Sequence, residues 1–189
     1  MDKASLRKEL LQKRETLSIS ERVKKDEMIR QRFLSLKEFR DANKVFLYAS
    51  YRAEVDTFGL ISVALNDSKK VALPKVFPTE REIRFFWIRD LNEVSPGYWG
   101  IPEPEEGVEA LPEEPELIVV PAVGYDIRGY RIGYGGGYYD RFLKKTGPSA
   151  ITVGLAYEEQ LVERIPNDEW DVPVKIIITE GRTIYCNGH

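Results

Sequence analysis

Apolar residues in the first 40 positions recur at the spacing of an α-helix. Leu6 and Leu10 lie one turn apart and predict a helix over residues 3–16. Ser18 and Glu21 form a capping box, in which each side chain pairs with the backbone N–H of the other residue, and this motif predicts the start of a second helix. We expect this second helix to end near Leu36. Four of its apolar residues should face inward: Val23, Ile29, Phe33 and Leu36.

Short apolar runs further along the chain are rich in strand-forming residues. They predict strands over residues 44–49, 71–73, 83–88, 117–120, 151–156 and 174–179, with an edge strand over 182–185. Helices are predicted over residues 56–66 and 137–145. The alternation of strands and helices predicts a three-layer α/β/α fold. No composition break divides the chain, so we expect a single domain over residues 1–189, with the basic N-terminal helices of residues 1–40 packed on the α/β core.

One acidic segment interrupts this alternation. Residues 95–116 contain five prolines and many glutamates, and we predict an ordered loop without regular structure. Residues 101–120 hold seven Glu and no basic residue, whereas residues 1–40 hold twelve Lys or Arg against seven Asp or Glu. Two interpretations of this asymmetry stay open: two solvated surfaces, or a basic N-terminal segment that helps to hold an anion.

The composition excludes several kinds of chemistry. The chain of 189 residues has one His and one Cys, His189 and Cys186, so a Ser-His-Asp triad, a Cys-His pair and a His- or Cys-rich zinc site are not expected. A net charge of −3 argues against a nucleic-acid coat. No signal peptide and no apolar run long enough for a bilayer is seen, so we expect a soluble cytoplasmic protein without a membrane partner. No long heptad or bare apolar face demands a partner chain, so we expect a monomer.

A glycine-rich loop carries the strongest chemical pattern. Six of the 14 glycines fall between residues 124 and 137, after a buried strand and before a helix. Such a loop exposes backbone N–H groups and predicts phosphate binding, although a tight structural turn is the alternative. The loop matches neither the Walker A nor the Rossmann pattern. Asp140, just inside the helix, is either a magnesium ligand beside the phosphates or a first-turn acid favoured by the helix dipole.

The segment from Arg131 to Arg141, RIGYGGGYYDR, resembles the signature of the 5-formyltetrahydrofolate cyclo-ligase (5,10-methenyltetrahydrofolate synthetase) family. Further blocks resemble the family in the same order along nearly the whole chain. They are Lys3-Ala4-Ser5-Leu6-Arg7, Glu54 after the first strand, Gly100-Ile101-Pro102-Glu103-Pro104, and Pro166-Asn167-Asp168-Glu169-Trp170-Asp171. The resemblance implies a three-layer fold with a mixed, largely parallel central sheet. It also implies conversion of 5-formyltetrahydrofolate to 5,10-methenyltetrahydrofolate with ATP as co-substrate and Mg²⁺ as cofactor.

The resemblance also implies roles for individual residues. Arg131 and Asp140 are expected to be catalytic, and Asp140 and Asp171 are expected to bind the metal. The residues expected to bind ATP are Lys3, Arg7, Arg131, Gly133, Tyr134, Gly135, Gly136, Gly137, Tyr138 and Tyr139. The residues expected to bind the folate are Ala49, Glu54, Tyr134, Gly135, Gly136, Gly137 and Tyr138. Trp99, Ile101 and Pro102 are expected to form apolar walls for the pterin, and Trp170 is expected to pack so that it fixes Asp171.

Two details leave alternatives open. Some family members carry Lys where this chain has Gly136, so phosphate here would rely on backbone amides, Arg131 or an N-terminal base. Asp168 competes with Asp171 as the metal ligand, and the resemblance favours Asp171. Two other function classes also remain: a sugar-phosphate isomerase or CoA-transferase-like enzyme on a related fold, and a non-catalytic nucleotide- or folate-binding protein.

Overall fold

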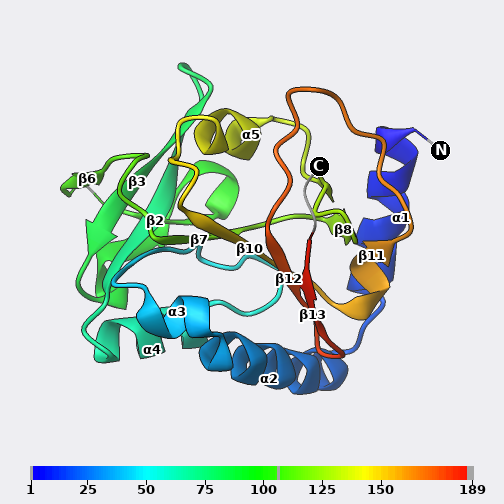
Figure 1. Cartoon of the computed structure of the whole chain (residues 1–189), viewed down its shortest axis with the longest axis horizontal. Helices are drawn as coiled ribbons and strands as arrows, with labels where there is room; N and C mark the ends of the chain where they lie inside the picture. The colour runs from blue at the N-terminus through cyan, green and yellow to red at the C-terminus, as the bar shows by residue number, and fades with distance from the viewer. Residues whose placement is uncertain (1, 106, 187–189) are drawn as a thin grey trace.

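The computed structural model describes residues 2–105 and 107–186, and within them a mixed sheet of eight strands forms the centre of the molecule (Figure 1). The strand order is β13-β12-β10-β7-β1-β2-β3-β6. The bounds are β1 Lys44–Phe46, β2 Lys70–Phe77, β3 Glu82–Ile88, β6 Glu109–Ala110, β7 Leu117–Val120, β10 Ile151–Leu155, β12 Ile176–Ile178 and β13 Thr183–Tyr185. Four neighbouring pairs, from β12 to β2, are parallel, and the three outer pairs are antiparallel. The expected mixed, largely parallel sheet is confirmed.

Helices cover both faces of this sheet, which confirms the three layers. Figure 1 shows α2 (Ile19–Ser35), α3 (Lys37–Asp41) and α4 (Phe58–Asn66) on one face and α5 (Tyr138–Leu143) on the other. The capping box predicted at Ser18 and Glu21 opens α2. Among the helices of the described residues, none combines the length and the apolar character needed to cross a membrane.

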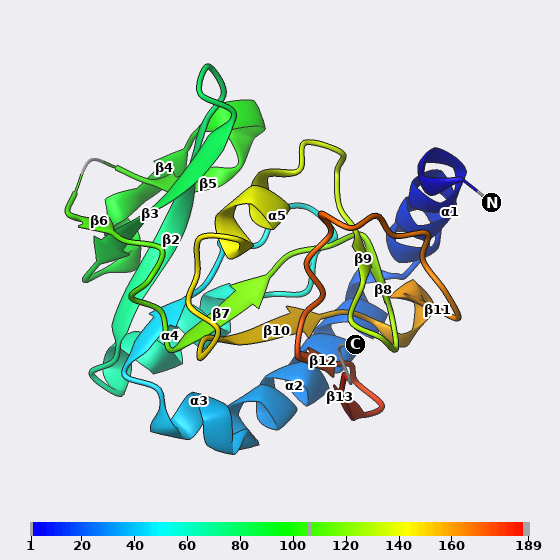
Figure 2. The ribbon, with the colours of Figure 1, turned by 45° about the horizontal axis from the view of Figure 1, so that its top comes forward.

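A second, smaller sheet lies at one end of the main sheet. Its order is β11-β8-β9, with bounds β8 Gly124–Asp126, β9 Arg131–Ile132 and β11 Leu161–Val162. Helix α1 (Lys3–Glu15) stands beside it in both ribbon views (Figure 2). Leu6 and Leu10 of α1 pack with Val123, Ile132 and Ile165 in a separate apolar cluster. Helix α1 therefore packs on the smaller sheet, whereas α2 packs on the main sheet.

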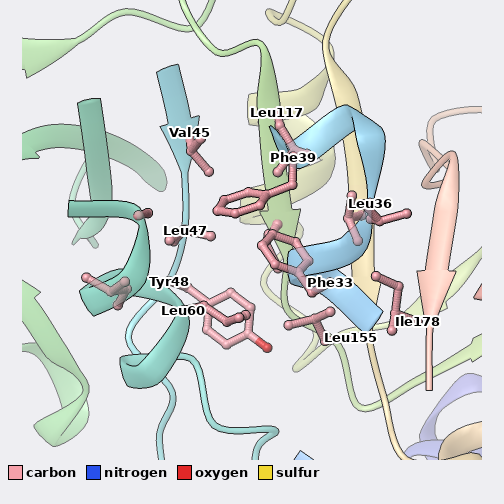
Figure 3. Packing of buried hydrophobic residues seen from close by; sticks show 14 of the residues in the cluster. Phe33, Leu36, Phe39, Val45, Leu47, Tyr48, Leu60, Leu117, Leu155 and Ile178 are labelled. Atoms are coloured by element: carbon pink, nitrogen blue, oxygen red, sulfur yellow. The ribbon is translucent and has the colours of Figure 1, made fainter. Parts of the chain in front are cut away.

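Apolar packing explains why the inner strands read as continuous hydrophobic runs. All four residues of β7 are buried, because helices cover both faces of a parallel sheet. Figure 3 shows one face, where Phe33 and Phe39 meet with ring centroids 4.7 Å apart over Leu47, Leu117 and Leu155. On the opposite face, an aromatic cluster forms around the stacked rings of Phe46 and Phe85, which lie 4.7 Å apart, and includes Phe142 of α5.

Three predictions about local structure are wrong. Residues 95–116 are not a loop without regular structure, since they hold most of β4 (Val94–Pro96), the 3-10 turn η2 (Tyr98–Gly100), β5 (Pro102–Pro104) and β6. The ribbon β4-β5 tolerates its prolines because an edge pair leaves one row of backbone groups outside the ladder. The loop after β7 contains β8 and β9. The helix predicted over residues 137–145 is only the six residues of α5.

Val23 is a further correction, because its side chain is 61% exposed, while Ile29, Phe33 and Leu36 are buried as expected. Six helical positions correspond to about 600° of rotation, so Val23 lies roughly 120° around the helix from Ile29. The short segments η1 (Leu91–Glu93) and η3 (Glu158–Gln160) complete the elements of the described residues. His189 lies outside the described residues.

Candidate functional site

The topology of the sheet directs a ligand site to one edge. The chain enters the sheet at β1 and continues to β2 through α4, then returns to β7 on the other side of β1 and continues to β10 through α5. The two crossover helices lie on opposite faces (Figure 1). The carboxyl ends of β1 and β7 therefore border a topological switch point, where open α/β sheets form a crevice for ligands.

A cleft of about 920 Å³ lies at this edge. Ala49 and Glu54 follow β1, and Pro121 follows β7, so both sides of the switch point contribute to its wall. All of the residues that the sequence predicts for ATP, folate and metal line this one cleft: Lys3, Arg7, Ala49, Glu54, Arg131, Gly133, Tyr134, Gly135, Gly136, Gly137, Tyr138, Tyr139, Asp140 and Asp171. The structure thus brings them together, and their individual roles remain predictions.

The glycine-rich loop presents bare backbone to the cleft. Gly135 and Gly137 have φ values of 101° and 66°, a left-handed conformation that glycine adopts without steric cost. A Cβ at Gly133 would meet nothing within 4 Å, so a ligand can approach the main chain there. A Cβ at Gly136 would lie 2.5 Å from the ring of Tyr138. The Tyr138 ring can therefore occupy its present position only because residue 136 is a glycine. A lysine at position 136 would displace the ring.

Asp140 is tied to the segment that precedes β12. Its Oδ1 accepts a hydrogen bond from Nη2 of Arg131 at 2.7 Å and from the backbone N–H of Val172 at 3.1 Å. Arg131 also donates from Nη1 to the carbonyl of Val172 at 2.5 Å, and its side chain is only 6% exposed. In Figures 1 and 2 this orange segment passes the yellow-green loop before α5. Arg131 therefore neutralises Asp140 and links it to the neighbour of Asp171.

Lys3 performs the same function for the second carboxylate. Its Nζ lies 2.7 Å from Oδ2 of Asp171 and 2.8 Å from Oδ2 of Asp168. Burial opposes the charge of Lys3, but hydrogen bonds to the two carboxylates outweigh it and raise the pKa of the lysine. The backbone N–H of Asp168 also donates to Oδ2 of Asp171 at 2.9 Å. Asp168 thus supports Asp171, which is the more buried of the two carboxylates.

Each carboxylate uses one oxygen for these contacts and keeps the other free. Among the described residues, no hydrogen-bond donor reaches Oδ2 of Asp140 or Oδ1 of Asp171. The described residues also contain no cluster of three or more His, Cys, Asp or Glu side chains that would cage a metal ion. Two carboxylates with one free oxygen each are the donor set that Mg²⁺ takes when phosphate oxygens and water complete its shell.

Arg7 belongs to the same face of α1 as Lys3 but contacts a different element. Its Nε donates to the carbonyl of Gly133 at 2.6 Å, and the end of its guanidinium lies 3.7 Å from the position of a Cβ on Gly135. The guanidinium thus follows the glycine-rich loop. Lys3 and Arg7 together place two cations of α1 on the wall of the cleft.

Glu54 lines the cleft from the turn after β1. The backbone N–H of Tyr51 donates to Oε2 at 2.8 Å, and the hydroxyl of Tyr134 donates to Oε1 at 3.1 Å. Burial raises the pKa of Glu54, and these two hydrogen bonds and the charge of Arg14 oppose the shift. The carboxylate is therefore fixed in orientation on the wall of the cleft, where it can accept N–H donors from a ligand.

Aromatic side chains form the remaining wall. Trp99, Ile101 and Pro102 line the cleft as expected, and the indole of Trp99 stacks on Tyr98 with ring centroids 4.9 Å apart. Trp170 also lines the cleft and is 54% exposed, and its packing role stays a prediction. The hydrogen bonds that hold the carboxylate of Asp171 come from Lys3 and from the backbone of Asp168.

Several polar residues of the site were not predicted from the sequence. The cleft is also lined by Tyr51, Arg52, Arg81, Glu103, Arg141 and Lys144. Arg14 was missed as well, although it lies one turn after Leu10 on the buried side of α1. The spacing of Leu6, Leu10 and Arg14 contained this signal. Arg141 and Lys144 follow Asp140 in and just after α5, and the other residues come from strands and turns whose approach to the site no local pattern indicates.

Comparisons with known proteins point to one family. A sequence model of the 5-formyltetrahydrofolate cyclo-ligase family matches residues 1–180. A 5-formyltetrahydrofolate cyclo-ligase of Haemophilus influenzae is 35% identical over 173 residues, which cover 89% of this chain and 92% of the relative. The solved structure of Aquifex aeolicus 5,10-methenyltetrahydrofolate synthetase has 39% identity and a TM-score of 0.88, and the match covers 100% of this chain and 95% of that one. The synthetase from Mycoplasma pneumoniae has 29% identity and a TM-score of 0.78, covering 95% and 99%.

Proposed function

Because the chain belongs to the 5-formyltetrahydrofolate cyclo-ligase family, we propose that its cleft converts 5-formyltetrahydrofolate and ATP into 5,10-methenyltetrahydrofolate, ADP and phosphate. The family match supports this reaction and gives no support to a sugar-phosphate isomerase, a CoA transferase or a non-catalytic binding protein. The single observation that carries the proposal is the cleft itself, in which both predicted substrate sites share one wall, the glycine-rich loop.

The reaction must activate an amide. The formyl group on N5 of the folate is an amide, so its carbon is a poor electrophile and its oxygen a poor leaving group. Transfer of the γ-phosphoryl group of ATP to the formyl oxygen makes that oxygen a leaving group. N10 then attacks the carbon and loses its proton to solvent, phosphate departs with the former formyl oxygen, and the five-membered ring is complete. The protein supplies positioning and charge compensation and needs no nucleophile of its own.

The side chains available in the structure suit such a mechanism. The one thiol of the chain belongs to Cys186, and burial raises its pKa to about 11, so the thiol stays protonated at neutral pH and is a poor nucleophile. Cys186 is also not among the residues that line the cleft. Covalent catalysis by this residue would therefore lack both an activated thiolate and access to the substrate.

The phosphates of ATP would lie along the glycine-rich loop. Residues 133–137 line the cleft, the position beside Gly133 is open, and positive φ values at Gly135 and Gly137 are typical of backbone that binds an anion through its amides. Arg7 reaches this stretch from α1, so its charge can offset the negative charge of the phosphates, while Lys3 lines the same cleft beside Asp171. Arg131 acts mainly through Asp140, since its donors are already bonded to that carboxylate and to Val172.

Asp140 and Asp171 would hold the magnesium ion through their free oxygens, Oδ2 and Oδ1. When bound, Mg²⁺ neutralises charge on the phosphate oxygens and helps to align them for transfer. Arg131 and Lys3 fix the two carboxylates by hydrogen bonds to the other oxygen of each. The hydrogen bond from Val172 to Asp140 keeps the two residues, which are far apart in the sequence, on one side of the cleft.

The folate would occupy the end of the cleft that Glu54 borders. The pterin ring offers paired N–H donors, and a carboxylate accepts such a pair well. Tyr134, Tyr138 and Ala49 adjoin this end, while Trp99 and Pro102 provide apolar surface for the ring. We also propose that the protein is a single-domain monomer that acts on small-molecule substrates in the cytoplasm. The chain has one Cys and cannot form an internal disulfide, as is typical of cytoplasmic proteins.

An optical assay tests the proposed function. The methenyl product absorbs at longer wavelength than the formyl substrate, so the new band should appear only when folate, ATP and Mg²⁺ are all present. Glu54→Gln keeps the size of the side chain but removes the charge, and it should raise the KM for the folate about tenfold while leaving the KM for ATP unchanged. A band that forms without ATP would contradict the reaction, and equal changes in both KM values would contradict the role of Glu54.

A further inference from the structure

Arg14 is a buried cation outside the cleft. Its side chain is 3% exposed and lies near the end of α1, on the face that also buries Leu6 and Leu10. Nη2 donates a hydrogen bond to the hydroxyl of Tyr134 at 3.0 Å, while Nε and Nη1 are buried and have no partner among the described residues. A buried guanidinium with one hydrogen bond is costly unless an opposite charge compensates it. Apolar packing alone therefore does not explain why an arginine occupies this buried position.

The compensating charge is Glu54, which Arg14 reaches through one hydroxyl group. Tyr134 accepts the hydrogen bond from Arg14 and donates to Oε1 of Glu54 at 3.1 Å. Partial burial and the neighbouring carboxylate of Glu54 raise the pKa of Tyr134, so its phenol keeps the proton that it donates. The chain of contacts joins three segments that are distant in the sequence: α1, the glycine-rich loop and the turn after β1.

The consequence for Glu54 follows from charge and geometry. Burial favours the protonated form of this carboxyl, and the positive charge of Arg14 favours the ionised form. An ionised carboxylate accepts hydrogen bonds with both oxygens, whereas a protonated one presents a donor that conflicts with the N–H groups of a pterin. The hydrogen bond from Tyr134 also fixes the rotation of the carboxylate, which the backbone of Tyr51 holds from the other side.

We propose that Arg14 is a positioning residue for the folate, which holds Glu54 ionised and correctly oriented through the hydroxyl of Tyr134. Arg14 is not among the residues lining the cleft and does not touch the ligand in this arrangement. The inference rests on the proposed function of Glu54 as the acceptor for the pterin. It adds a specificity element in α1 that selects ligands carrying paired N–H donors.

The test compares Arg14→Met with Arg14→Lys. The methionine variant keeps an unbranched apolar stem without charge, and it should raise the KM for the folate about tenfold while the KM for ATP changes little. Lysine restores the charge next to Tyr134 and should recover most of the affinity. Tyr134→Phe removes the connecting hydroxyl from a side chain that is 55% exposed, so this variant should fold and show the same selective loss even if Arg14→Met does not fold.

Arg22→Met is the matched control. Arg22 is a partly buried arginine of α2 whose Nε also lacks a partner among the described residues, and it does not line the cleft. Its replacement should leave both KM values unchanged. In the double variant Arg14→Met/Glu54→Gln the folate KM should be no higher than in Glu54→Gln alone, because both changes remove the same interaction.

The outcomes separate this inference from the proposed function. A folded Arg14→Met or Tyr134→Phe variant with unchanged folate KM, or with equal changes for folate and ATP, overturns the role of Arg14. Additive effects in the double variant also overturn it. If Glu54→Gln itself leaves folate binding unchanged, the proposed folate site fails instead. Loss of stability with unchanged KM values would assign Arg14 a purely structural role.

Discussion

Replacement of Asp140 by asparagine separates its contribution to the fold from its contribution to the reaction. The amide oxygen of Asn can take the place of Oδ1 and continue to accept from Arg131 and from the N–H of Val172. The amide nitrogen then replaces Oδ2, the oxygen proposed to bind the metal. The variant therefore keeps the shape and most hydrogen bonds of the site while it removes the negative charge.

The cost in stability should be small. Arg131 is 6% exposed, but it retains its hydrogen bond to the carbonyl of Val172 and a neutral acceptor at position 140. Hydrogen bonds between charged groups contribute about 1.5–3 kcal/mol and neutral ones about 0.5–1.5 kcal/mol, so the free energy of unfolding should fall by about 1–2 kcal/mol. For a chain of this length such a change lowers Tm by about 2–8 °C.

The cost in activity should be much larger. Loss of one preorganised group that compensates charge in the transition state lowers turnover roughly 10²–10³-fold. The assay follows the methenyl absorbance at saturating folate while ATP and Mg²⁺ are varied, and urea unfolding checks the fold. Glu169→Gln, which removes an exposed charge from the neighbouring segment, is the matched control and should behave like the wild type. A folded Asp140→Asn protein with turnover within about 3-fold of the wild type would refute the reasoning, since 3-fold corresponds to less than about 1 kcal/mol.

Three further predictions follow from other contacts. Asp171→Asn should reduce the apparent affinity for Mg²⁺ more strongly than Asp168→Asn in the same assay, because Asp171 lines the cleft and Asp168 does not, and the reverse order would identify Asp168 as the ligand. Gly137→Ala should lower the free energy of unfolding by about 1–2 kcal/mol and raise the KM for ATP, because φ is 66° there and the new Cβ would lie 2.8 Å from Nη1 of Arg141; unchanged urea midpoints would argue against a strained loop. Burial raises the pKa of Asp26, which the hydrogen bond from Tyr157 offsets only in part, so the folded state binds this proton more tightly and loses stability as pH rises through the raised pKa. Asp26→Asn should therefore stabilise the protein more at pH 7 than at pH 4 in urea unfolding, and a difference independent of pH would contradict the raised pKa.

Much of the fold is determined locally by the sequence. The capping box at Ser18 places the start of α2, and the apolar run Leu117–Val120 marks a strand buried on both faces, since these patterns depend on neighbours in the chain. The glycine-rich segment could likewise be singled out from the sequence as a candidate phosphate loop. Its backbone has φ > 0 at Gly135 and Gly137, a local conformation for which glycine is required. The strands within residues 95–116 could not be predicted from the sequence, because prolines normally disfavour strands. Here β4 and β5 form by pairing with each other.

Only the tertiary structure decided how the chemical groups meet. Asp140 and Asp171 are 31 positions apart, and a hydrogen bond from Val172 together with the ion pairs of Arg131 and Lys3 places them on one wall. The link from Arg14 to Glu54 also passes through a third segment and has no local pattern in the sequence. The physical reason is that periodicity reports the face a side chain occupies on its own element, whereas charge pairing depends on which elements the sheet topology brings side by side.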